Sequence, residues 1–201
     1  MKKLFVVAAV MLAAVGAQAQ RAVGSWSFQP KVGMNVAGLT KTDDSDARIG
    51  LALGAEAEYQ LTDLFSLTGG VMYSQQGTKW TGDMDIYDIP FNGTATLKLD
   101  YINVPILANV YVAKGFAVKL GLQPGFLVNK QVKIKAMGQS ISKDIPSEAG
   151  LNTFDLSIPV GVSYEYKNVQ LDARYNWGVT NVAKDSDTKN SVFQFTLGYK
   201  F

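Results

Sequence analysis

The sequence of 201 residues contains no cysteine and no histidine. Without cysteine the chain can form no disulfide and carry no cysteine-linked lipid. The usual ligands of zinc and haem are missing, so we expect no cofactor. Histidine most often moves the proton in hydrolases, so a serine such as Ser74 or Ser163 lacks its usual base. These absences argue against an enzyme.

An excess of charge of one sign is also missing. The formal net charge of +2 comes from Lys2 and Lys3, because the rest of the chain has 17 basic and 17 acidic residues. A nucleic-acid-binding domain normally carries a basic excess that neutralises phosphates. The charge balance therefore excludes nucleic acid as an expected partner.

The only long apolar run lies at the amino terminus, from Leu4 to Gly16, and follows Lys2 and Lys3. This run is shorter than the roughly 20 residues of a membrane-spanning helix. A basic start, a short apolar segment and Ala17-Gln18-Ala19 are the parts of a secretory signal peptide. We expect residues 1–19 to be cleaved and residues 20–201 to form one domain, as their length allows.

The mature sequence is dominated by alternation with a period of two. In its last ten residues the odd positions are large and apolar, whereas the even positions are mostly polar or small. Such alternation predicts a strand with two different environments on its faces. The same pattern recurs in seven earlier segments, residues 26–36, 49–59, 65–74, 102–112, 116–128, 154–166 and 169–179. Leu97 and Leu99 fall on the opposite parity, which predicts a bulge near Asp100 or Tyr101.

The connections between these segments alternate strictly between tight and long. The tight ones are residues 61–64, 113–115 and 167–168, and the long polar ones are residues 39–48, 78–95, 136–152 and 180–190. Outer-membrane barrels have short periplasmic turns and longer external loops, whereas Greek-key sandwiches have no reason for this asymmetry. We therefore predict an all-β, eight-stranded antiparallel up-and-down transmembrane barrel, a monomer in the bacterial outer membrane.

Aromatic residues on the apolar parity gather at two levels, which is typical of the girdles at lipid headgroups. The predicted periplasmic girdle consists of Trp26, Phe28, Tyr59, Phe65, Phe116, Tyr164, Tyr166, Tyr199 and Phe201. The predicted outer girdle consists of Tyr73, Phe126, Phe154, Tyr175, Trp177 and Phe193. The alternative is a soluble secreted barrel with these aromatic residues in its core.

Eight charged residues fall on the polar parity and are expected to face the lumen, namely Lys31, Glu56, Glu58, Lys119, Glu165, Asp172, Arg174 and Lys200. An eight-stranded barrel is just wide enough to be filled by side chains, so buried charges there should pair. We predict that Lys31 pairs with Glu56 or Glu58, and that Asp172 pairs with Arg174 and Lys200. A structural network is the favoured interpretation, and a narrow ion pathway is the alternative.

Acidic residues cluster in the long loops at Asp43, Asp44 and Asp46, at Asp83, Asp85 and Asp88, and at Asp185 and Asp187. Several carboxylates on a flexible loop can bind Ca²⁺. None of the clusters matches a complete EF-hand pattern, and solvated loop charge is the favoured interpretation.

Several stretches resemble the PorT-like outer-membrane β-barrel family, small barrels of the OmpA/OmpX kind common in Bacteroidetes-type bacteria. They are residues 101–106 (YINVPI), 161–166 (GVSYEY), 171–181 (LDARYNWGVTN) and 197–201 (LGYKF). The resemblance implies an eight-stranded barrel in the outer membrane and little about activity. The namesake of the family is associated with a secretion system, but the shared residues are architectural.

We expect a non-enzymatic barrel with a structural or adhesive surface role, in contact with outer-membrane lipid. The terminal aromatic strand is also similar to the signal that barrel-assembly machinery recognises. A small pore or ligand-binding barrel, an accessory of a secretion system, and a concealed enzyme remain as alternatives.

Overall fold

The computed structural model describes residues 22–42, 45–86, 89–136, 139–146, 150–184 and 186–201, without the side chains of 83–86, 89–92 and 136. The expected signal peptide, residues 1–19, lies outside these ranges. Within them, no helix is long and apolar enough to span a membrane.

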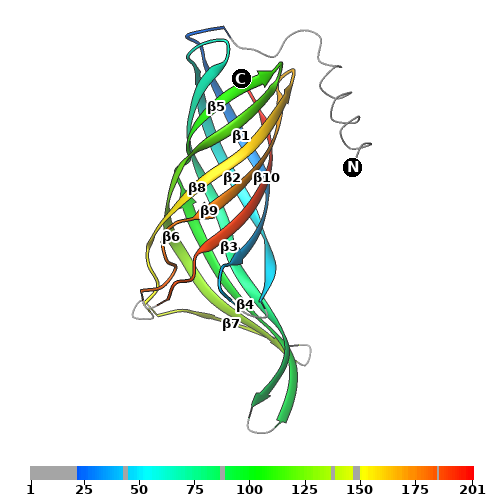
Figure 1. Cartoon of the computed structure of the whole chain (residues 1–201). Helices are drawn as coiled ribbons and strands as arrows, with labels where there is room; N and C mark the ends of the chain where they lie inside the picture. The colour runs from blue at the N-terminus through cyan, green and yellow to red at the C-terminus, as the bar shows by residue number, and fades with distance from the viewer. Residues whose placement is uncertain (1–21, 43–44, 87–88, 137–138, 147–149, 185) are drawn as a thin grey trace, which may run out of the picture.

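Ten antiparallel strands form one sheet that closes on itself, because β1 pairs with both β2 and β10 while β2 also pairs with β3. Figure 1 shows the tilted strands wound into a barrel. The strands are β1 (Trp26–Leu39), β2 (Ser45–Gln60), β3 (Phe65–Ile86), β4 (Ile89–Asn103), β5 (Ile106–Ala113), β6 (Phe116–Ala136), β7 (Gln139–Asp144), β8 (Phe154–Tyr166), β9 (Val169–Gly178) and β10 (Asn190–Tyr199).

All the strands except β7 build the barrel wall. Because β4 and β5 together take the place of one strand, the wall has the eight strands that the sequence predicts. Both pair with β3 on one side and β6 on the other. The break falls at Val104 and Pro105, where proline lacks the N–H that a continuous ladder would use. The predicted bulge is confirmed, because the β4–β6 register shifts between Asp100 and Tyr101.

The described residues of the predicted long loop 78–95 are strand, so its assignment as a loop was wrong, and the predicted long loop 136–152 contains the short strand β7. Strand β3 continues to Ile86 and β4 begins at Ile89, while β6 continues to Ala136 and pairs with the short β7. Figure 1 shows the β3–β4 hairpin reaching far beyond the barrel. Polar residues are frequent there, so only short apolar alternations remain, at Leu97 and Leu99 of β4 and at Val132 and Ile134 of β6, although the backbone pairing continues.

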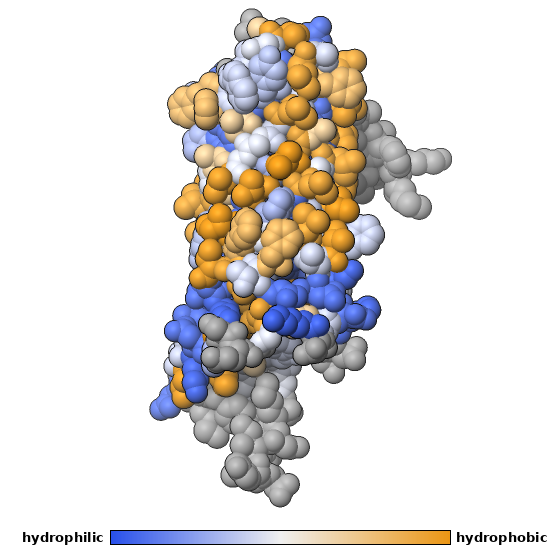
Figure 2. All heavy atoms as spheres, turned by 90° about the vertical axis from the view of Figure 1, so that its left-hand side faces the viewer, coloured by the Kyte–Doolittle hydropathy of each residue, from blue (hydrophilic) through white to orange (hydrophobic). Residues whose placement is uncertain are grey.

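The barrel has an apolar outer surface and a polar interior, which inverts the arrangement of a soluble domain. Apolar side chains of all the wall strands are exposed on the outside, while lysine, glutamate, glutamine and asparagine side chains are buried within. Figure 2 shows hydrophobic residues over most of the barrel face in view and hydrophilic residues near the end with the long loops. The three tight turns and the carboxy terminus lie together at the opposite end.

Candidate functional site

The centre of the lumen is occupied by a bidentate ion pair between Arg174 and Asp172, two inward neighbours on β9. Arg174 Nε donates to Asp172 Oδ1 at 2.6 Å and Nη2 donates to Oδ2 at 3.1 Å. The same Nη2 lies 2.6 Å from Oε1 of Glu56, which comes from β2. Both members of the β9 pair are at most 4% exposed. The guanidinium is the residue type best suited to such a fork, since its five donors are fixed in one plane.

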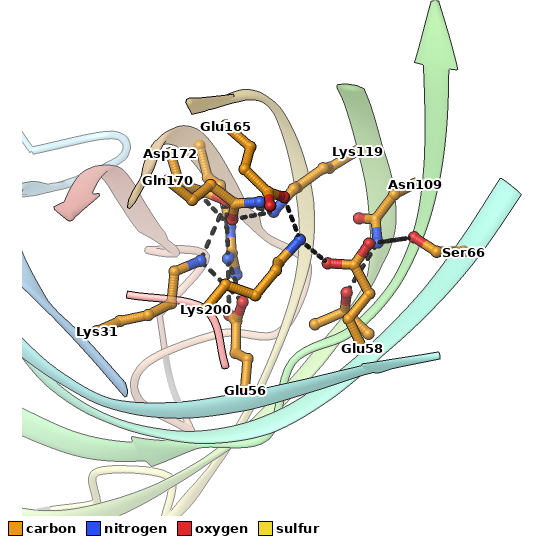
Figure 3. A network of polar contacts seen from close by, with 12 residues as sticks. Lys31, Glu56, Glu58, Ser66, Asn109, Lys119, Glu165, Gln170, Asp172 and Lys200 are labelled. Carbon is orange, nitrogen blue, oxygen red and sulfur yellow. Dashed lines mark hydrogen bonds and ion pairs between the residues drawn. The ribbon is translucent and has the colours of Figure 1, made fainter. Parts of the chain in front are cut away.

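Two lysines complete this central cluster from other strands, as Figure 3 shows. Lys31 of β1 lies 2.8 Å from Glu56 Oε2 and 3.2 Å from Asp172 Oδ2. Lys119 of β6 lies 2.5 Å from Asp172 Oδ2 and donates to Gln170 Oε1 at 3.2 Å. Asp172 therefore binds three cations from three strands and cross-links the barrel interior.

A second cluster lies around Lys200, nearer the tight turns. Its ammonium lies 2.8 Å from Glu58 Oε2 and 2.7 Å from Glu165 Oε2. Glu58 also accepts hydrogen bonds from Ser66 at 2.6 Å and from the hydroxyl of Tyr111. The carboxylate of Glu58 is thus bound by groups from β3 and β5 as well as by the end of the chain.

The predicted pairing of Asp172 with Arg174 is what the structure shows, whereas its predicted pairing with Lys200 is wrong, because Lys200 pairs with Glu58 and Glu165. Asp172 of β9 is paired in register with Thr196 of β10, and Lys200 follows Thr196 by four residues along the chain. Four residues of strand span about 13 Å, beyond the reach of an ion pair. The predicted pairing of Lys31 with Glu56 is what the structure shows, and its contact with Asp172 was not foreseen.

All eight predicted lumen residues are buried inside the barrel. Four are cations and four are anions, so the network is formally neutral. A buried charge without a partner costs several kcal/mol, whereas a paired and hydrogen-bonded one can be tolerated. The arrangement can hold strands together and can block passage through the lumen.

The end of the lumen near the long loops is filled by apolar side chains that the sequence pattern did not indicate. Leu99, Tyr101 and Val182 form a buried cluster, and partly buried leucines pack against it: Leu39, Leu97, Leu127 and Leu151. Leu99 and Tyr101 both lie inside because residues two apart on a strand share a face, and the register shift beside them is taken up by an extra residue of β6, Val128. Val182 comes from the loop before β10 and folds inward, which places an apolar layer above the ion pairs.

A polar group beside this layer was also missed by the sequence reasoning. The buried carboxylate of Asp100 accepts hydrogen bonds from the Tyr73 hydroxyl and the Asn129 amide, both at 2.9 Å. Arg48 Nη1 lies 3.7 Å from the same carboxylate and donates to the carbonyl of Gln76. The extra residue of β6 sets Asn129 opposite Asp100, a contact that no pattern within a single strand indicates.

The residues of the predicted periplasmic girdle all lie at the end with the tight turns. Trp26 and Phe28 on β1, Tyr166 on β8 and Phe201 are each more than 60% exposed. Neighbouring rings stack along the rim, with centroids 4.9 Å apart for Trp26 and Tyr59 and for Tyr199 and Phe201. At the other end, ring pairs join Phe126 to Phe154 and Tyr175 to Phe193.

The acidic clusters of the long loops fall mainly outside the described part of the chain. Asp43, Asp44, Asp88 and Asp185 are not described, nor are the side chains of Asp83 and Asp85. Among the described residues, no group of three or more acidic side chains is arranged to hold a metal ion.

A closed antiparallel barrel with eight wall strands, an apolar outer surface and a filled polar lumen defines a small β-barrel of the bacterial outer membrane. The sequence agrees with this class. The chain belongs to the outer membrane protein beta-barrel domain family, whose model matches residues 17–184. No curated protein matches the sequence.

Solved structures of small barrels are similar to this chain at low sequence identity. The attachment invasion locus protein Ail of Yersinia pestis is 17% identical, and its alignment covers 90% of this chain and 100% of the Ail chain with a TM-score of 0.48. Neisserial surface protein A is 15% identical, with 90% and 98% covered and a TM-score of 0.45. OprG from Pseudomonas aeruginosa is 13% identical, with 90% and 98% covered and a TM-score of 0.43.

Proposed function

We propose that this barrel is closed and non-enzymatic, and that it serves a structural or adhesive role at the cell surface. The filled lumen is the observation that carries the proposal. Eight charged side chains pair across the strands, with Asp172 bound by Lys31, Lys119 and Arg174. An ion crossing the barrel would have to displace these pairs and then the apolar layer of Leu99 and Tyr101.

The extended strands support a role directed outward. Strands β3, β4, β6 and β7 form a sheet beyond the barrel, at the end where outer-membrane barrels carry their external loops. A rigid sheet presents side chains for recognition at a lower entropic cost than a mobile loop. Among the described residues, β7 pairs with β6 alone, so its other edge can pair with another strand.

We also infer that the chain is a PorT-like barrel, on the strength of residues 101–106, 161–166, 171–181 and 197–201. Two of these stretches gain a physical reason from the structure. Residues 101–106 contain the proline break between β4 and β5, and residues 171–181 contain the central Asp172–Arg174 pair. An accessory role in secretion is the runner-up function, and the unpaired edge of β7 is the feature that favours it.

Conductance in planar lipid bilayers tests the closed lumen. Folded wild-type protein, recognised by its heat-dependent shift in gel mobility, should give no steady unitary steps. A large open porin inserted under the same conditions serves as the positive control. Reproducible steps from the wild-type barrel would favour the small-pore alternative and contradict the proposal.

Cross-linking on intact cells tests the surface role. We expect wild type to capture an external partner, and a variant with the β3–β4 hairpin cut back to the Gln76–Leu99 pair to lose it. A matched variant shortened in the loop before β10 should keep that partner. Identical capture by all three proteins would rule out the extended sheet as the contact surface.

A further inference from the structure

The outer wall of the barrel carries an apolar groove of about 540 Å³ that runs across β8, β9 and β10. Two rows of outward side chains border it. The first row starts at Phe116 of β6 and reaches Val32 of β1 through register partners on β8, β9 and β10. The second row consists of Val162, Ala173, Phe195 and Met34. Both rows belong to the membrane-facing surface, because their side chains alternate with those buried in the lumen.

The small side chain of Ala173 accounts for the depth of the groove. Its register partners Val162 and Phe195 carry larger side chains on the strands to either side. Leu171 and Tyr175, the nearest outward residues of its own strand, are larger as well. A methyl group among these four side chains leaves space over the backbone of β9. A hollow on a lipid-facing surface loses dispersion contacts unless an apolar group fills it, so the occupant should be apolar.

The groove climbs from the tight-turn end toward the middle of the membrane. Phe116 is the first residue of β6, directly after the turn at 113–115, whereas Val32 lies well inside β1, which begins at Trp26. The path from β6 through β8, β9 and β10 to β1 covers about 19 Å at a strand spacing of about 4.8 Å. With a strand tilt of about 40°, it rises about 12 Å, which is half of an apolar band about 25 Å tall. The groove therefore matches the depth of one lipid leaflet.

Two lysines lie at the end of the groove that is nearest the tight turns. The carbonyl of Gly115 accepts a hydrogen bond from the N–H of Glu165 at 2.7 Å, which sets the turn at 113–115 beside the end of β8. Lys114 of this turn and Lys167, which directly follows β8, are therefore neighbours. The ammonium of Lys167 lies 5.6 Å from the centroid of the Tyr166 ring. Its charge is thus at the level of the aromatic girdle, where lipid headgroups lie.

The charge of these two lysines exceeds that of the acidic group beside them. Among the described residues, no ion pair includes Lys114 or Lys167. The terminal carboxylate of Phe201 follows β10, on the side of β9 away from β8, and one carboxylate cannot neutralise two cations. Phosphate is the anionic group that phospholipids offer at headgroup level, and each nearby lysine strengthens the attraction.

We propose that the groove binds one acyl chain of an anionic phospholipid from the leaflet at the tight-turn end, with the phosphate of that lipid at Lys114 and Lys167. The chain enters beside Phe116 and ends beside Met34. It covers the seam where β1 and β10 close the barrel. The inference rests on the outer-membrane location and is independent of whether the lumen conducts or the extended strands bind a partner.

Photo-crosslinking lipids test the path of the chain. The full mature barrel is placed in nanodiscs of phosphatidylethanolamine that contain phosphatidylglycerol with a diazirine either near the ester group or at the end of the chain. Mass spectrometry of peptides then locates the adducts. We expect the shallow probe to label Phe116 and Tyr164, and the chain-end probe to label Phe195 and Met34. Equal labelling of every wall strand at each depth would indicate ordinary surrounding lipid and overturn the proposal.

A matched pair of substitutions tests the groove itself. Ala173→Phe fills it and should lower the phosphatidylglycerol retained in native mass spectrometry at least about threefold, because the chain loses its packing contacts. Ala108→Phe adds the same ring to an exposed position of β5 outside the groove and should retain lipid as wild type does. Equal retention by both variants would overturn the proposal. So would a wild-type dimer that Ala173→Phe converts to a monomer, because a second copy would then occupy the groove.

The headgroup contact is tested by removing the two cations. The variant K114Q/K167Q should lower the preference for phosphatidylglycerol over phosphatidylethanolamine at least about tenfold. The control K41Q/K184Q removes two cations from the loops at the other end of the barrel and should keep the wild-type preference. Folding of every variant is checked by its heat-dependent gel shift. A preference that K114Q/K167Q leaves unchanged, or that both variants lower equally, would contradict the proposed site.

Discussion

The ammonium of Lys200 lies 2.7 Å from Oε2 of Glu165 and connects the end of the chain to the interior of β8. The same residue is held by its backbone, since its N–H donates to the carbonyl of Asn168 at 2.7 Å. The Asn168 amide returns a hydrogen bond to the Lys200 carbonyl at 2.6 Å. The penultimate residue is therefore part of the barrel wall, and the final residue beside it is positioned by the fold.

Replacing Arg174 with leucine should destabilise the barrel by about 3–5 kcal/mol, because the substitution leaves the buried carboxylates of Asp172 and Glu56 without their guanidinium partner. The expected observation is a lower midpoint of the heat-dependent gel shift in detergent. Arg174→Lys keeps a cation and should lose less stability. An unchanged midpoint for the leucine variant would mean that the network does not stabilise the fold.

Replacing Gly33 with alanine should weaken the seam where the barrel closes between β1 and β10. A Cβ at this position would collide with the backbone carbonyl of Phe195 on β10, whose Thr196 is its register partner. Overpacking of this kind costs about 1–3 kcal/mol. Gly38 on the same strand has open space around its Cβ position, so Gly38→Ala should change stability by less than about 0.5 kcal/mol. Urea titration in detergent compares the two, and equal midpoints would contradict the prediction.

Single-tryptophan variants test the aromatic girdles directly. Trp26 and Trp177 are 63% and 57% exposed on the outer surface, near opposite ends of the barrel. In bilayers of brominated lipids, both should be quenched more by bromine near the headgroup than by bromine near the chain end. Trp80 lies on the extended sheet, opposite Ala95, and should be quenched little at any depth. Strongest quenching of Trp26 by deep bromine would contradict its place in a girdle.

Deleting Phe201 should slow insertion into the membrane more than it lowers the stability of the folded barrel. The backbone of Phe201 exchanges hydrogen bonds with that of Phe28, at 2.8 and 3.4 Å, and its side chain is exposed at the rim. We expect barrel-assembly machinery to engage this terminal aromatic strand. The measurement is the rate at which folded protein appears in proteoliposomes with and without the machinery. Phe201→Tyr keeps the ring and should insert normally, whereas equal rates for the deletion would rule out this role.

The alternation of side chains allowed the strands and their faces to be predicted without a structure. It placed Lys31 and Arg174 inside and Trp26 and Phe28 outside, because a lipid face and a filled lumen impose opposite requirements on neighbouring residues. The same rule located an irregularity near Asp100, which the structure takes up on β6. It did not predict the full length of β3, β4 and β6, because the alternation beyond the barrel is short and mixed with polar residues.

Period and parity determined that this chain forms a small outer-membrane barrel and which eight charged residues are buried in its lumen. Only the tertiary structure decided which of them meet, because tilt and stagger bring Lys200 beside Glu58 and Glu165 rather than Asp172. It also placed Val182 against Leu99 across the mouth and Lys79 beside Lys133 on either side of β4. Such contacts join residues distant in sequence, and local alternation carries no information about the distance between strands around a barrel.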